Sequence, residues 1–149
     1  MKKETLIKLT KYLLDFIYYV VIAVTVSLPI TIKKLGEFVE KLQEHYVESV
    51  IIYIILGLSA AVILAELRKM FNTVINKDCF VRGNVVSLNK MFKWSLVIVG
   101  MAIIRNIVYV TPAMLVVILV FVIAGLFSKV LSFVFEEAVG YKEENDFTI

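Results

Sequence analysis

Four stretches of the sequence contain no charged residue, and they constrain the fold more than any other feature. These stretches are residues 16–32, 49–65, 94–104 and 106–128. The chain is 60% apolar, whereas soluble domains are usually about 45–50% apolar. Since a bilayer core about 30 Å thick needs roughly 20 helical residues, the pattern predicts an all-α integral membrane protein.

We expect a single membrane domain over residues 1–149, a four-helix bundle with cytoplasmic amphipathic helices between its second and third spans. The first apolar stretch is longer than the core of a signal peptide and lacks a cleavage pattern, so we expect it to be retained as a span. Thr111 would cap the last span and Pro112 would begin it. The expected spans are about 12–32, 49–65, 92–110 and 112–134, with a central loop at 66–91 and a tail at 135–149.

The distribution of Lys and Arg predicts the orientation. If the N-terminus is inside, twelve of the sixteen basic residues lie on the cytoplasmic side. Cytoplasmic loops of membrane proteins carry an excess of Lys and Arg. We therefore expect a multi-pass protein of the cell membrane with both termini and the central loop in the cytoplasm. The outer basic residues would be Lys33, Lys34, Lys41 and Arg105.

Small residues recur at a spacing of four in the second and fourth spans. The second span has Gly57, Ala61 and Ala65, and the fourth has Ala124, Ser128 and Ser132. Such ridges let helices approach closely in a membrane. We expect these two spans to pack on each other within one chain. The alternative is that the small residues form the interface of a homodimer.

Two basic residues fall within or beside the apolar stretches. Arg105 lies about 16 Å along the third span from Trp94, at 1.5 Å per residue. Its side chain would snorkel to the outer headgroups, pair with a group inside the bundle, or bind a ligand or ion. Lys129 would snorkel at the inner end of the fourth span, where Glu66 is its expected partner.

Apolar residues at helical spacing continue outside the spans. The central loop contains two such stripes, joined by a predicted turn at Asn76-Lys77-Asp78 in which Asp78 would cap the second helix. Basic amphipathic helices of this kind attract anionic lipid, and they can also dock a cytoplasmic partner. A third stripe at residues 33–48 predicts an amphipathic helix on the outer membrane surface. The loop stripes are Leu67, Met70, Phe71, Val74 and Ile75, then Val81, Val85, Leu88 and Phe92.

The central loop and the tail have opposite charges. Residues 66–93 contain six basic and two acidic side chains, whereas residues 136–149 contain five acidic side chains and Lys142. We expect the tail to continue the fourth span as a helix and to lie close to the loop. Exposed ion pairs contribute only about 0–1 kcal/mol each, so the association would be reversible.

Two motifs carry a resemblance to a known family. One is Cys79-Phe80-Val81-Arg82-Gly83-Asn84-Val85 followed by Leu88, and the other is the ending Lys142-Glu143-Glu144-Asn145-Asp146-Phe147-Thr148-Ile149. Together they resemble a bacterial four-span membrane family known as domain of unknown function 2975, over essentially the whole chain. The sequence departs from the family pattern at Cys79, Gly83 and Phe147. The resemblance implies a regulatory pairing, because members are often encoded beside a small Cro-type helix-turn-helix regulator.

These observations favour a regulatory or scaffolding membrane protein that binds a cytoplasmic partner, for which the small helix-turn-helix regulator is our candidate. That partner would bind DNA, because this chain shows no nucleic-acid fold of its own. The alternative is a small oligomeric transporter or channel, motivated by Arg105. The expected partner-binding residues are Phe80, Arg82, Asn84, Val85 and Leu88 of the loop and Glu143, Glu144, Asn145, Asp146, Phe147 and Ile149 of the tail.

We expect no enzymatic activity, cofactor or metal. The sole histidine, His45, and the sole cysteine, Cys79, would lie on opposite faces of the membrane. A Cys–His pair therefore cannot form within one chain. The sequence also contains no metal-ligand spacing and no phosphate-binding glycine loop.

Overall fold

The structure is a computed structural model and describes residues 2–147. Ile149, one of the predicted partner-binding residues, lies outside the described residues, as does the side chain of Phe147. Helices make up almost all of the described chain, and no strand occurs in it, so the all-α prediction is confirmed. The elements are α1 (Lys3–Gly36), α2 (Glu40–Glu44), α3 (Tyr46–Ile75), α4 (Arg82–Val108) and α5 (Pro112–Phe147).

The helices α1, α3, α4 and α5 are each long and apolar enough to cross a membrane. These are the helices of a multi-pass membrane protein. At 1.5 Å per residue, the 34 residues of α1 and the 36 of α5 each span about 50 Å. Both helices are therefore longer than the hydrocarbon core of about 30 Å, and their ends extend beyond it.

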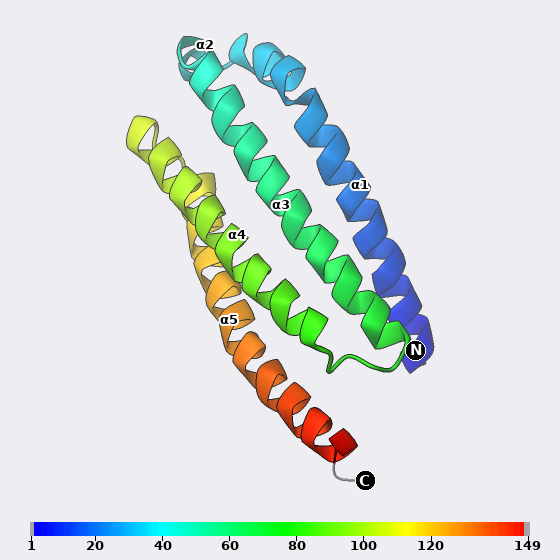
Figure 1. Ribbon diagram of the computed structural model, residues 1–149. Helices are drawn as coiled ribbons and strands as arrows, with labels where there is room; N and C mark the ends of the chain where they lie inside the picture. Colours follow the sequence, from blue (N-terminus) through cyan, green and yellow to red (C-terminus); the bar gives the residue numbers. More distant parts are fainter. Residues whose placement is uncertain (1, 148–149) are drawn as a thin grey trace.

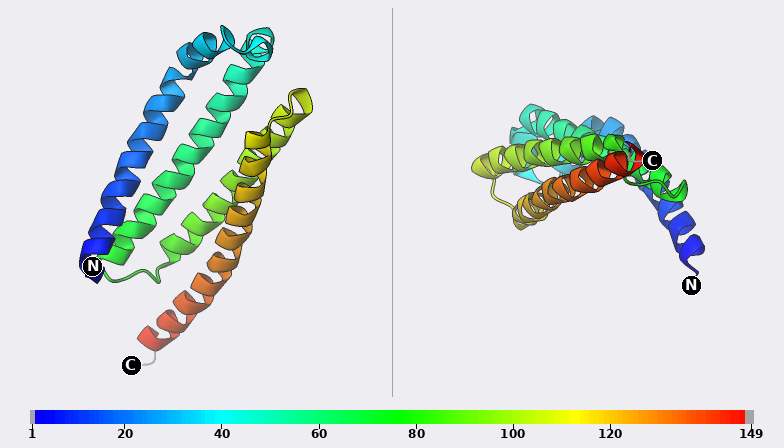
Figure 2. Two further views of the ribbon diagram at one scale, coloured as in Figure 1. Left: turned by 180° about the vertical axis from the view of Figure 1, so that it is seen from behind. Right: turned by 60° about the horizontal axis from the view of Figure 1, so that its bottom comes forward.

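The four long helices form an open bundle in which α1 packs on α3, α3 on α4 and α4 on α5 (Figure 1). Figure 2 shows the same row from behind. Between residues 2 and 147, α1 makes no contact with α4 or α5, and α3 makes none with α5. We call the end that holds both chain ends and the α3–α4 loop the termini end, and the opposite end the α2 end (Figure 1).

Small residues mark the closest helix contacts, although their partners differ from those predicted. A Cβ atom added to Gly57 would lie 2.2 Å from the Oγ1 of Thr25 on α1. One added to Gly125 would lie 3.1 Å from the Cβ of Ser95 on α4. Lipid provides little hydrophobic gain for helix association, so contacts this close supply much of the packing energy. The predicted packing of the second span on the fourth is wrong, because α3 does not contact α5 within residues 2–147; Gly57 of α3 faces α1 instead, and Gly125 of α5 faces α4.

The two amphipathic stretches of the central loop are helical but continue the spans. Helix α3 runs to Ile75 and α4 begins at Arg82, so only residues 76–81 connect them. Val85 and Leu88 of the second stripe are buried, as is the neighbouring Met91. The prediction of separate helices on the membrane surface is therefore corrected: neighbouring helices, rather than lipid, cover this apolar stripe.

The amphipathic helix predicted at residues 33–48 does not form. Residues 37–39 interrupt it, α2 has only five residues, and the side chain of Phe38 is 85% exposed. Tyr46 begins α3, and its hydroxyl donates a hydrogen bond of 2.9 Å to the carbonyl oxygen of Pro29. Because Pro29 lies inside α1 and lacks an N–H, it interrupts the hydrogen bonds of that helix. The bond from Tyr46 ties this weakened part of α1 to α3.

The connections between helices are short. As predicted, Thr111 caps α5, where the Met114 amide nitrogen lies 3.3 Å from the Thr111 hydroxyl oxygen. The predicted turn after α3 is also confirmed, with Lys77 in a left-handed conformation at a φ of 59°. Its hydrogen bonds, from Asp78 N–H to Thr73 O and from Lys77 N–H to Val74 O, are those of a Schellman C-cap. Asp78 does not cap α4, which begins after Val81 without a side-chain cap.

Candidate functional site

Residues from the central loop and from the C-terminal part of α5 meet at the termini end, as the opposite charges predicted. The Nη2 atom of Arg82 donates to both carboxylate oxygens of Glu143, at 3.2 and 3.0 Å. Lys142 pairs with Asp78, and the rings of Phe80 and Phe135 meet edge to face with centroids 5.3 Å apart. We call these three contacts the loop–tail clasp. They hold the end of α5 against the α3–α4 loop.

The ion pairs of the clasp lie at the surface. The side chains of Arg82 and Glu143 are each 52% exposed, so their attraction is worth only about 0–1 kcal/mol. The hydrogen bond to Asp78 is the main reason why the pKa of Lys142 lies above its ordinary value. That ammonium therefore stays charged at physiological pH. Glu144, Asn145 and Asp146 continue α5 beyond the clasp and are exposed.

Three of the predicted partner-binding residues are buried within the bundle. Val85 and Leu88 belong to its core, and Asn84 is only 3% exposed. The Asn84 side-chain nitrogen donates to the Cys79 carbonyl oxygen at 2.6 Å and to the Thr73 hydroxyl at 2.8 Å. It therefore fixes the loop to the end of α3. The exposed members of the predicted set are Phe80, Arg82, Glu143, Glu144, Asn145 and Asp146.

Beneath the clasp lies Glu66, a buried carboxylate that is only 5% exposed. The Ser87 hydroxyl of α4 donates to it at 2.7 Å. Lys69 and Lys90 approach its other oxygen at 3.4 and 3.9 Å. The predicted pairing with Lys129 is wrong: the Lys129 ammonium donates to Asn89 Oδ1 at 2.8 Å instead. The Glu66–Lys69 pair could have been predicted from the sequence, because residues three apart on a helix are neighbours on its surface.

A further ion pair joins α1 to α3. The Nε of Arg68 donates to Asp15 Oδ1 at 2.6 Å. The Arg68 guanidinium carbon also lies 4.5 Å from the ring centroid of Tyr18 and 5.3 Å from that of Tyr19, within the range of a cation–π contact. Asp15 is not among the residues for which the sequence predicts a role. Its position directly before a charge-free stretch was the available signal, because an acid at that depth needs a partner.

The buried network, the loop–tail clasp and all of the long helices except the start of α1 lie within a region that matches a known family. The model of the family described as "Protein of unknown function (DUF2975)" matches residues 13–149. The chain belongs to this family. No curated protein and no solved structure matches it. The matched region begins in α1 and includes both sides of the clasp, so the resemblance of the loop and tail motifs to DUF2975 is confirmed.

In this DUF2975 protein Arg105 does not snorkel, which corrects the leading expectation for it. The side chain is only 3% exposed. Its guanidinium carbon lies 5.9 Å from the ring centroid of Tyr53 and 5.3 Å from that of Tyr109, and the ammonium of Lys41 lies 4.4 Å from the Tyr109 centroid. Within residues 2–147, Arg105 forms no ion pair and its Nε has no hydrogen-bond partner. The rings of Tyr53 and Tyr109 face this buried charge.

Proposed function

We propose that this DUF2975 protein is a membrane scaffold that holds a soluble cytoplasmic partner on the surface around the loop–tail clasp. The observation that carries the proposal is the clasp itself. Arg82–Glu143 and Lys142–Asp78 join two segments 61 and 64 residues apart in sequence. A solvated tail would need no such fixed position. Holding it against the loop creates a single surface with exposed aromatic, basic and acidic side chains.

The chemistry of the exposed tail indicates the kind of partner. Glu144 and Asp146 extend from the clasp on the last turn of α5, and they favour a basic protein surface. Small DNA-binding regulators carry such a surface, because their recognition elements use Lys and Arg to contact phosphates. We therefore propose a small helix-turn-helix regulator as the partner. Binding to the acidic tail would compete with its binding to DNA.

The proposal can be tested by recovery of the purified regulator on the immobilised, detergent-solubilised protein. Deleting residues 142–149 leaves every span intact, so insertion into the membrane should be unchanged while regulator recovery is lost. A double reversal, Glu144→Lys with Asp146→Lys, should lower recovery at least tenfold by repelling the basic partner. The matched control reverses Glu37 and Glu40, which lie at the α2 end and should not affect recovery. Full recovery by the truncated protein would disprove the proposal.

A further inference from the structure

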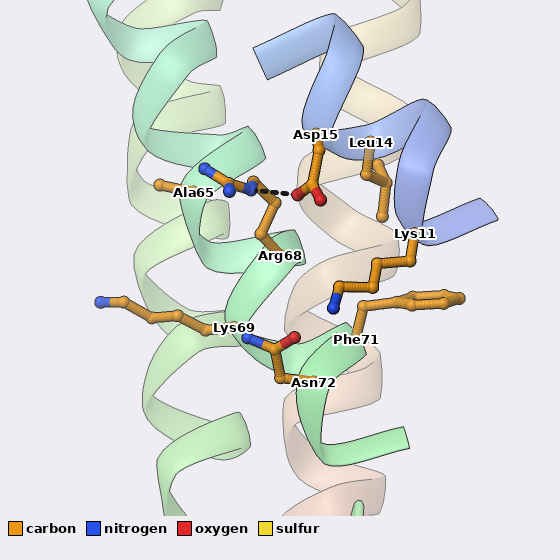
Figure 3. Close-up of a pocket in the computed structure, with 8 residues that line it drawn as sticks. All are labelled: Lys11, Leu14, Asp15, Ala65, Arg68, Lys69, Phe71 and Asn72. Atoms are coloured by element: carbon orange, nitrogen blue, oxygen red, sulfur yellow. Dashed lines mark hydrogen bonds and ion pairs between the residues drawn. The ribbon is translucent and has the colours of Figure 1, made fainter. Parts of the chain in front are cut away.

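A cavity of about 380 Å³ lies between α1 and α3 at the termini end. Three basic side chains and one acidic side chain line it, and the ammonium of one of the three, Lys69, pairs with Glu66 outside the wall. Apolar side chains complete the wall, as Figure 3 shows. The lining residues are Lys11, Leu14, Asp15, Ala65, Arg68, Lys69, Phe71 and Asn72.

Lys11 is the one basic residue of this wall without a partner. Its ammonium has no ion pair or hydrogen bond within residues 2–147, although the residue is half-buried. Figure 3 shows its end directed into the space between the Asp15–Arg68 pair and Asn72. An ammonium with no partner attracts negative charge, so it would stabilise an anion in this space.

The acidic residue of the wall is already engaged. Asp15 accepts the Arg68 Nε at 2.6 Å, so it does not neutralise Lys11. This pair lies at one edge of the cavity, and Figure 3 shows the terminal guanidinium nitrogens of Arg68 directed away from Lys11. The side chain of Asn72 adds an exposed amide that can donate hydrogen bonds. The ammonium of Lys11 and the amide of Asn72 therefore lie beside the same space (Figure 3).

The position of the cavity indicates the source of the anion. Tyr18 and Tyr19 lie about one turn further along α1, where their rings contact Arg68. Tyrosines of transmembrane helices gather at the depth of the lipid headgroups. Leu14, Ala65 and Phe71 provide an apolar side to the same cavity. Basic pockets between transmembrane helices on the cytoplasmic side bind the headgroups of anionic lipids.

We propose that this cavity binds the phosphate group of an anionic membrane lipid, with Lys11 and Asn72 as ligands and the Asp15–Arg68 pair as their support. The lipid chains would run along the apolar side formed by Leu14 and Phe71. A lipid seated there would hold α1 against α3, since the cavity is lined by both helices. This site is independent of the loop–tail clasp, so either proposal can fail without the other.

The test is the thermal unfolding of the full chain in detergent with rising amounts of phosphatidylglycerol. The lipid should raise the melting temperature of the parent, because a ligand that binds only the folded state stabilises it. Lys11→Gln should need at least tenfold more lipid for the same shift. Lys93→Gln removes an exposed lysine outside the cavity and serves as the matched control, which should behave like the parent.

Two further arms identify the source of the phosphate. Phosphatidylcholine, which is zwitterionic, should give a much smaller shift, and inorganic phosphate alone should give none at the same concentration. An equal response of Lys11→Gln and parent to phosphatidylglycerol overturns the proposal, as does full stabilisation by inorganic phosphate or phosphatidylcholine. If Lys11→Gln does not accumulate, Lys11→Arg and Asn72→Ala replace it. The melting temperature of Lys11→Arg should respond to phosphatidylglycerol as the parent does, and that of Asn72→Ala should respond more weakly. Equal responses from these two variants also overturn the proposal.

Discussion

Each end of the helix row contains a buried charge, and the two charges are accommodated differently. At the termini end, Glu66 is 5% exposed, accepts a hydrogen bond of 2.7 Å from Ser87 and has two lysines nearby. At the α2 end, Arg105 is 3% exposed, faces the rings of Tyr53 and Tyr109, and has an Nε with no hydrogen-bond partner. The first charge is satisfied by hydrogen bonds and opposite charge, whereas the second faces aromatic rings and forms no ion pair within residues 2–147.

The difference extends to the neighbouring polar groups. Within residues 2–147, the buried side-chain atoms without a hydrogen-bond partner are Ser49 Oγ, Arg105 Nε and Asn106 Nδ2. Ser49 lies in the first turn of α3 and the other two in the last turn of α4, so all three lie toward the α2 end. A satisfied buried group stabilises its fold, whereas an unsatisfied one costs free energy. The two ends should therefore respond to mutation with opposite signs.

The largest expected effect comes from Glu66→Ala. The substitution leaves Ser87 buried without its acceptor, and hydrogen bonds to charged groups are worth about 1.5–3 kcal/mol. We expect the free energy of unfolding in detergent to fall by about 2–3 kcal/mol. Glu66→Gln keeps an acceptor for Ser87 and should lose less. An unchanged melting temperature for Glu66→Ala would show that the network is not stabilising, which would remove the contrast between the ends.

Arg105→Met tests the other end and should have the opposite sign. A buried charge replaced by an apolar side chain of similar volume often leaves a protein as stable or more stable, by about 1–4 kcal/mol. The cation–π contacts offset part of this gain, so we expect a gain of about 1 kcal/mol. Arg105→Ala is the control, since it also leaves a cavity and should destabilise. A clear loss in Arg105→Met would mean that the tyrosine rings outweigh the cost of burying the charge.

Lys77→Gly separates two contributions to stability at the termini end, the backbone strain at Lys77 and the side-chain network of Glu66. The substitution changes the first and leaves the second intact. Lys77 has a φ of 59°, where a side chain costs about 1–2 kcal/mol and glycine does not. Glycine also gains freedom in the unfolded chain, so the net stabilisation should be about 0.5–1 kcal/mol. Lys77→Ala keeps the strain and should show no such gain in thermal unfolding. Equal behaviour of the two variants would argue against strain at this turn.

The smallest effect is expected for the exposed pair of the clasp. Reversing Arg82 to Glu or Glu143 to Arg should each destabilise slightly, and the double reversal should restore the pair. A double-mutant cycle should give a coupling of about 0.5 kcal/mol. Raising the salt concentration to 1 M should weaken the coupling by screening. A coupling as large as the loss in Glu66→Ala would mean that exposed and buried pairs at this end are equivalent.

Much of the fold was predictable, because it depends on local properties of the chain. A helix satisfies its own backbone hydrogen bonds, which is obligatory in lipid, so each charge-free stretch predicted a span without reference to any other. The Thr111 cap and the turn at 76–78 follow from residues adjacent in sequence. The predicted proximity of loop and tail also proved correct, because charges of opposite sign on the same side of the membrane attract.

The partners of individual side chains were not predictable. Lys129 pairs with Asn89 rather than Glu66, and Gly57 packs on Thr25 of α1 rather than on α5. A ridge of small residues shows that a helix is closely packed but not against which neighbour. The choice depends on how the helices are arranged and on their register, which local sequence does not contain.

By itself, then, the sequence determined the number of spans, the Thr111 cap, the turn at 76–78 and the charge of each end, because hydropathy, capping and charge act over a few residues or through the membrane as a whole. Only the tertiary structure decided that α1 touches α3 alone among the long helices, that Glu66 is satisfied and Arg105 is not, and that a basic cavity opens beside Lys11. The physical reason is that lipid-facing and helix-facing sides of a span are both apolar, so composition cannot distinguish them. Contacts between helices depend on distances of a few ångströms between residues far apart in sequence.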